Sequence, residues 1–183
     1  AMLRLAVAAA RRHAAVPRAA PAWLRPAGLR LCTTPAQHAE GLIAALKAGD
    51  EDTAMDVLEG ASAVDLSATD NYGSTALTLA CRAGHLDLAK ALLARDPPPP
   101  LDAQNIFGST ALMCAAASGH ADVCRELLRH PVNLEVASQY GSTALTKAAE
   151  AGHADIVRQL LDKGADPTVV NKLGKSAADL AEG

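Results

Sequence analysis

Residues 70–93 read DNYGSTALTLACRAGHLDLAKALL, residues 105–128 read NIFGSTALMCAAASGHADVCRELL, and residues 138–161 read SQYGSTALTKAAEAGHADIVRQLL. The three stretches share Gly-Ser-Thr-Ala-Leu, then Gly-His, then a pair of leucines at fixed offsets. The first glycine of the shared motif recurs at a nearly constant interval, as Gly73, Gly108, Gly141 and Gly174. This period predicts a stack of repeated units, each too small to bury its apolar face alone.

Each unit carries the signals of a turn followed by two short helices. The first glycine predicts a turn with positive φ, and the threonine two residues later, such as Thr75, predicts a helix N-cap. The next glycine, Gly84 in the first unit, predicts the end of that helix. A second helix follows with an acid in its first turn and a leucine pair that we expect in the core. The leucine pairs are Leu92 and Leu93, Leu127 and Leu128, and Leu160 and Leu161.

These motifs resemble the ankyrin repeat, a family unit that consists of a β-turn and two helices. The resemblance covers about residues 40–183, although Ala stands where the family usually has Pro, and Thr or Met where it has His. It implies an all-α solenoid of helix-turn-helix units with β-hairpin-like turns. We expect three full repeats, residues 70–104, 105–137 and 138–170, between two atypical caps, residues 40–69 and a partial cap at 171–183.

Residues 1–39 differ from the rest of the chain in composition. They hold six Arg, no Lys and no acid, a charge of +6, whereas residues 40–183 carry −9. An Arg-rich, Ala-rich and acid-free segment is typical of an organelle transit peptide. We therefore expect a disordered transit-peptide-like segment that directs the protein to the mitochondrion. A plastid address, or a compositionally biased tail on a cytoplasmic protein, remains the alternative.

Composition and spacing argue against several function classes. The charge of −9 on residues 40–183 has the wrong sign for contacts with nucleic-acid phosphates, and no long apolar run predicts membrane insertion. One histidine per unit predicts a structural role at the inter-helix turn instead of a metal site, and these are His85, His120 and His153. We also expect buried free thiols at Cys81, Cys114 and Cys124. No catalytic constellation or phosphate-binding loop is apparent, so we expect no enzyme activity, no metal and no cofactor.

The resemblance implies a non-catalytic protein–protein interaction module, an adaptor or regulatory subunit that binds through its hairpin tips and inner helices. In the family the position before the turn glycine is exposed and used for recognition, and here it holds three aromatic residues. The predicted contact residues are Asn71, Tyr72, Ser74, Arg82, Ile106, Phe107, Ser109, Gln139, Tyr140, Ser142, Lys147, Glu150, Lys172 and Leu173. A second interpretation is that each ring folds over its own turn and shields the neighbouring helix.

Two further expectations concern the partner and one loop. We expect a protein partner and a chain that is monomeric on its own. The alternative is the recognition domain of a larger multidomain protein, such as an enzyme, whose catalytic part lies beyond residue 183. The first unit is slightly longer than the others, and its excess falls at Pro97–Pro100, which predicts a solvated polyproline II segment.

Overall fold

The computed structural model describes residues 34–61 and 63–181. The expected transit-like segment therefore lies outside the described residues as far as residue 33. Its expected end at residue 39 differs from the structure, because helix α2 (Pro35–Ala48) begins earlier. The Thr34 side chain accepts a hydrogen bond from the Gln37 backbone N–H, and the Gln37 side chain accepts one from the Thr34 backbone N–H. This capping box, with Pro35 in the first turn, sets the start of the helix.

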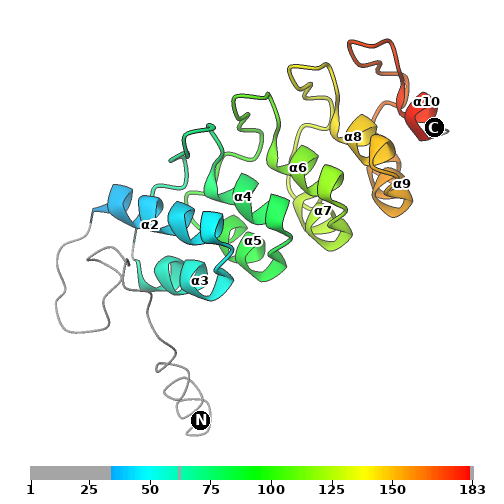
Figure 1. Cartoon of the computed structure of the whole chain (residues 1–183). Coiled ribbons are helices and arrows are strands. Elements are labelled where there is room, and N and C mark those ends of the chain that lie inside the picture. Colours follow the sequence, from blue (N-terminus) through cyan, green and yellow to red (C-terminus); the bar gives the residue numbers. More distant parts are fainter. Residues whose placement is uncertain (1–33, 62, 182–183) are drawn as a thin grey trace, which may run out of the picture. The chain divides into compact units, whose positions relative to one another are not determined.

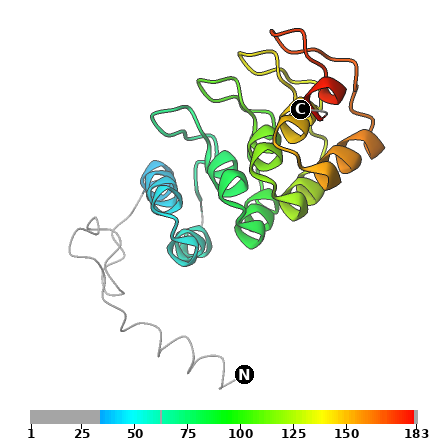
Figure 2. The ribbon, with the colours of Figure 1, turned by 45° about the vertical axis from the view of Figure 1, so that its right-hand side comes forward.

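The described residues form an all-α stack of helix pairs, as the sequence predicted. Helices α2, α4, α6, α8 and α10 pack side by side in an inner layer, and α3, α5, α7 and α9 form an outer layer (Figures 1 and 2). The remaining helices are α3 (Glu51–Gly60), α4 (Ala76–Ala83), α5 (Leu86–Leu93), α6 (Ala111–Ser118), α7 (Ala121–Leu127), α8 (Ala144–Glu150), α9 (Ala154–Asp162) and α10 (Ala177–Ala181). None of the helices described is long and apolar enough to cross a membrane.

Threonine caps start the inner helices of the three full repeats. The side chains of Thr75, Thr110 and Thr143 each accept a hydrogen bond from the backbone N–H three residues later. Each cap satisfies one of the free N–H groups at a helix start, which is worth about 1 kcal/mol. The three threonines are themselves buried, so these caps lie inside the stack and fix where each inner helix begins.

The core is built from leucine and alanine. Leu77, Leu112 and Leu145 occupy equivalent positions in the inner helices and are at most 3% exposed. Alanines beside them, such as Ala80 and Ala115, are fully buried and let successive helices approach closely. Complete burial of one leucine side chain contributes about 1.5–3 kcal/mol. The stack therefore gains its stability from many contacts between small apolar side chains.

One leucine of the predicted core lies at the surface. Leu93 and Leu128 are each 7% exposed, whereas the equivalent Leu161 is 42% exposed. Helix α7 packs on α5 and α9 packs on α7, but no outer helix packs on the far side of α9 within residues 34–181. The expectation that all three leucine pairs lie in the core was therefore wrong for Leu161.

The histidines connect neighbouring repeats. His120 Nε2 lies 3.1 Å from the backbone oxygen of Arg82, and His85 Nδ1 lies 2.9 Å from Glu51 Oε2. The ring of His120 also lies against Gly84, where an added Cβ would be 2.6 Å from a ring atom. The expected role at the turn between helices is therefore too narrow, since each contact reaches the preceding unit.

The polyproline segment is less solvated than predicted. Pro99 is buried, whereas Pro97, Pro98 and Pro100 are exposed. In the next repeat the position of Pro99 is taken by Val132, a half-buried loop residue that packs against the core. An apolar side chain is needed at this position of the loop, and Pro99 supplies it. The prediction of a fully solvated insertion was therefore wrong for this residue.

Candidate functional site

Four turns project from the same side of the stack (Figure 1), and we call them fingers 1 to 4: residues 70–75, 105–110, 138–143 and 171–176. In each finger the first side chain accepts hydrogen bonds from the backbone N–H groups two and four residues later. In finger 1, Asp70 Oδ1 accepts from Tyr72 at 2.9 Å and from Ser74 at 2.8 Å. The residues that do this in the other fingers are Asn105, Ser138 and Asn171. Each finger is thus a turn that is closed by the side chain of its first residue.

A ladder of backbone hydrogen bonds joins the tips of the fingers. The N–H of Ile106 donates to the oxygen of Tyr72 at 2.9 Å, and the N–H of Gln139 donates to the oxygen of Phe107 at 3.0 Å. The N–H of Lys172 continues the ladder with a 2.9 Å bond to the oxygen of Tyr140. The accepting residue is each time the one before the turn glycine. The ladder therefore fixes the spacing of these positions from finger to finger.

Gly108 shows how closely the fingers approach one another. Its φ is 73°, and a Cβ built there would lie 2.6 Å from the backbone nitrogen of Gln139. Any other residue would meet both a strained backbone and the next finger. The glycine of the repeated motif is thus needed for the contact between fingers as well as for the turn.

The apolar side chains at the tips face solvent. Tyr72 is 52% exposed, Phe107 47%, Tyr140 63% and Leu173 81%, and we call these four the apolar row. The rings of Tyr72 and Phe107 are stacked, with centroids 6.5 Å apart and an interplanar angle of 22°. The rings therefore lie along the line of fingers, and about half of each ring's surface remains open.

The other predicted contact residues divide into two groups. Ser74 and Ser142 are 1% and 3% exposed, and their backbone N–H groups donate to Asp70 and Ser138 within the same turns. We therefore correct the assignment of Ser74 and Ser142 as contact residues. Ser109 is half-buried by the same turn geometry, and Gln139 uses its side-chain amide to donate to the oxygen of Ile106 at 2.6 Å.

The remaining predicted residues lie at the surface. Asn71, Ile106, Gln139 and Lys172 are exposed beside the apolar row. On the inner helices, Arg82 and Glu150 are exposed near the ends of α4 and α8, and Lys147 is half-buried. Lys147 Nζ lies 2.8 Å from Glu150 Oε2. The two opposite charges of this pair therefore neutralise each other.

The thiols have no features of a reactive site. Burial raises the pKa of the Cys81 thiol above its ordinary value, with a smaller contribution from Cys124 and Cys114. Burial also raises the pKa of Cys124 to about 12, and it raises the pKa of Cys114 against the opposing effect of the Arg82 charge. Cys114 is half-buried, so the expectation of a buried thiol was wrong for this residue. These groups remain protonated near neutral pH, so they are poor nucleophiles. Within residues 34–61 and 63–181, no group of three or more His, Cys, Asp or Glu side chains is arranged to hold a metal.

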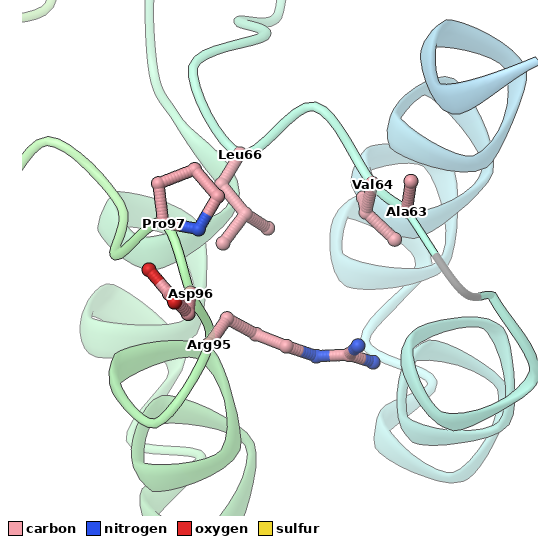
Figure 3. Close-up of a pocket in the computed structure, with 6 residues that line it drawn as sticks. All are labelled: Ala63, Val64, Leu66, Arg95, Asp96 and Pro97. Atoms are coloured by element: carbon pink, nitrogen blue, oxygen red, sulfur yellow. The ribbon is translucent and has the colours of Figure 1, made fainter.

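A cavity of about 100 Å³ lies away from the fingers, between the N-terminal cap and the first repeat (Figure 3). It is lined by Ala63, Val64, Leu66, Arg95, Asp96 and Pro97. The Arg95 side chain reaches from the end of α5 toward the cap, where its guanidinium donates to the backbone oxygens of Leu58 and Ala61. Arg95 thereby satisfies two carbonyls at the end of α3. The Arg95 guanidinium is therefore already bound within the fold, and the other charged lining residue, Asp96, is exposed to solvent.

The loops that precede the fingers in the chain are joined from repeat to repeat by a second set of hydrogen bonds. Asp102 Oδ1 accepts from the N–H of Asn133 at 3.1 Å, and Glu135 Oε1 accepts from the N–H of Asp166 at 2.9 Å. Between the cap and the first repeat the position equivalent to Asn133 is Pro100, which has no N–H to donate. Arg95 supplies the connection at this junction.

Sequence reasoning missed two sets of residues. The first is the position three residues before each turn glycine, where Asp70 and its counterparts close the fingers. A signal was present, because Asp, Asn and Ser are the residues that form such turns. The second is Arg95, whose contacts reach far along the chain to Leu58 and Ala61 and leave no local pattern.

Comparison with known proteins agrees with the predicted repeats. Residues 96–171 match a family model described as ankyrin repeats in three copies. Residues 57–112 match a second model described as ankyrin repeats in many copies. A search of curated proteins found no match to the chain. The two matched segments together cover fingers 1 to 3 and the first residue of finger 4.

Proposed function

Since residues 57–171 are ankyrin repeats, a family whose members are typically protein–protein interaction modules, we propose that this chain is a non-catalytic protein-binding module that contacts its partner through the apolar row. The observation that carries the proposal is the exposure of Tyr72, Phe107, Tyr140 and Leu173 on fingers held by one backbone ladder. A folded domain rarely leaves a contiguous line of large apolar side chains open unless the line binds something.

The geometry favours an extended partner. Packed helices lie about 8–10 Å apart, so the tips of neighbouring fingers repeat at roughly that distance. An extended chain advances about 3.3 Å per residue, so every second side chain would match the Tyr72 and Phe107 rings, which are 6.5 Å apart, and about every third would match the other positions of the row. The fingers are held in place before binding, so little ordering entropy is lost when a partner arrives.

The exposed part of each aromatic side chain is the surface that a partner would bury. Buried aromatic anchors in interfaces commonly cost more than about 2 kcal/mol when truncated, which is more than a tenfold loss of affinity. Truncation should affect folding less, because these rings are already 47–63% exposed. Tyr140 is the cleanest position, because it forms no stacked pair within the part of the chain that the structure describes.

The test compares partner capture by the full chain with capture by a variant carrying Tyr72→Ala, Phe107→Ala and Tyr140→Ala. We expect the variant to lose the partners of the parent chain while it still unfolds cooperatively. Leu161→Ala is the matched control, since Leu161 is similarly exposed but lies on α9, away from the fingers. Equal capture by the triple variant, or equal loss with Leu161→Ala, would show that the row is not the contact surface.

We also propose that residues 1–39 direct the protein to the mitochondrion. The support is their charge of +6 without a single acid. A fusion of residues 1–39 to a fluorescent reporter should reach mitochondria, and a version with its six Arg changed to Gln should remain in the cytosol. A diffuse signal from the unchanged fusion would refute the address.

A further inference from the structure

The charges of the fingers are distributed unevenly along the row. Finger 1 has one charged residue, Asp70, whose carboxylate already accepts two backbone N–H groups and is half-buried. Fingers 2 and 3 have no charged residue. Finger 4 has two charged residues, Lys172 and Lys175. Both are exposed, and Lys172 lies beside Leu173. The apolar row therefore ends in positive charge at the side of finger 4.

Lys172 differs from the cations of the outer helices. Those cations, and Arg129 just after α7, pair with an acid three residues earlier, as in Asp87–Lys90, Asp122–Arg125, Glu126–Arg129 and Asp155–Arg158. Lys172 forms no ion pair with any of the residues that the structure places. Its backbone is fixed by the bond to Tyr140, so its side chain starts from a defined point beside Leu173. The neighbouring Lys175 lies near Asp179 and contributes to lowering the pKa of that carboxyl, after the larger effect of the Ser176 hydrogen bonds.

We infer that the partner segment is an extended peptide of about eight or nine residues, with an apolar side chain at every second or third position and a carboxylate side chain that meets Lys172 at the finger 4 end. The length follows from the 6.5 Å between the Tyr72 and Phe107 rings and two further intervals of about 8–10 Å, covered at about 3.3 Å per residue. This inference rests on the proposed function, because it specifies the chemistry of the partner that binds the row.

The charge at one end also sets the direction of the bound segment. Carboxylates opposite Lys172 are attracted, whereas carboxylates opposite finger 1 meet Asp70 and gain nothing. The ion pair is exposed, so its contribution is modest and is screened by salt. The three aromatic rings supply most of the affinity in this arrangement. Lys172 selects among apolar segments and fixes the chain direction in which they bind.

The test uses a library of random dodecapeptides with neutral flanks, selected on the full chain, on Lys172→Glu and on Lys163→Glu. Lys163 is an exposed lysine at the end of α9 without an ion pair in the described part of the chain, so its variant makes the same charge change away from the row. Peptides that the triple ring variant no longer binds are kept for analysis. We expect Asp or Glu to be enriched near one end of these peptides on the parent chain and on Lys163→Glu, and Lys or Arg in its place on Lys172→Glu.

A selected peptide then allows a quantitative check by fluorescence anisotropy. Replacing its end carboxylate with the corresponding amide should weaken binding to the parent chain about fivefold, the scale of one exposed ion pair, and should leave binding to Lys172→Gln unchanged. Ring-dependent peptides without acidic enrichment, or with an enrichment that survives Lys172→Glu, would overturn the inference and leave the row as a binding surface. A selection without ring-dependent peptides would also overturn it, while the proposed function is decided separately by partner capture.

Discussion

Replacing Gly119 with alanine should destabilise the stack by more than the same replacement at Gly152. Both glycines follow an inner helix with similar backbone angles, φ 82° at Gly119 and φ 76° at Gly152. They differ in what covers them. A Cβ at Gly119 would lie 2.6 Å from the ring of His153, whereas a Cβ at Gly152 would meet no atom within 4 Å.

The backbone cost is common to the two variants. An L-residue in the left-handed region costs about 1–2 kcal/mol, and the lower entropy of alanine in the unfolded chain returns about 0.4–1 kcal/mol. Gly152→Ala should therefore lower the free energy of unfolding by about 1 kcal/mol. At Gly119 the His153 ring must also move by about 0.8 Å to restore an ordinary contact of 3.4 Å, and because the ring is only half-buried this costs about 1 kcal/mol, the low end for overpacking. The total for Gly119→Ala is about 2 kcal/mol.

The measurement is urea unfolding followed by far-UV circular dichroism, with both variants compared at one pH. A double-mutant cycle with His153→Ala separates the two causes, because removal of the ring should reduce the cost of Gly119→Ala to that of Gly152→Ala. Equal costs for the two glycine variants in the parent chain would refute the reasoning. So would a cost of Gly119→Ala that persists after the His153 ring is removed.

Two further predictions concern the cap junction and the buried thiols. Arg95→Met should speed hydrogen exchange in α3 and cost about 1.5–3 kcal/mol, whereas Arg129→Met, which removes an exposed pair with Glu126, should change stability by under about 1 kcal/mol. Because the pKa of Cys124 is raised to about 12 in the folded state, its contribution to stability is complete below pH 8 and is lost between about pH 9 and 12. Urea midpoints at about pH 7.5 and 10 should fall less for Cys124→Ala than for the parent chain, and an equal fall would contradict the assignment.

The repeat architecture could be predicted from the sequence because its signals are local and recur. Thr75, Thr110 and Thr143 each act within three residues, and the turn glycines act on their own φ, so a pattern of a few residues determines each element. Each of these local patterns then occurs again in every repeat, which makes it easier to recognise. Fold class and the order of helices follow from this alone.

The features that sequence reasoning missed depend on contacts between units. Ser74 and Pro99 are polar or turn-forming by type and were expected at the surface, yet both are buried in the folded stack. Leu161 carries the apolar pattern of a core residue, and its exposure depends on whether a further helix packs on α9. For the apolar row the sequence indicated the positions, and the backbone ladder that holds them required the structure.

The missing loop bond at Pro100 makes the first junction mechanically different from the others. Along a linear array of repeats, rupture begins at the interface that is held by the fewest independent connections. Under tension or transient opening, helices α2 and α3 should detach there as one cooperative unit, after the Arg95 contacts and the His85–Glu51 contact break. The apolar row begins at Tyr72 and its ladder runs from finger 1 onward, so the row lies on the side of the first junction that stays assembled. A protease that removes the detached cap would then leave the row intact.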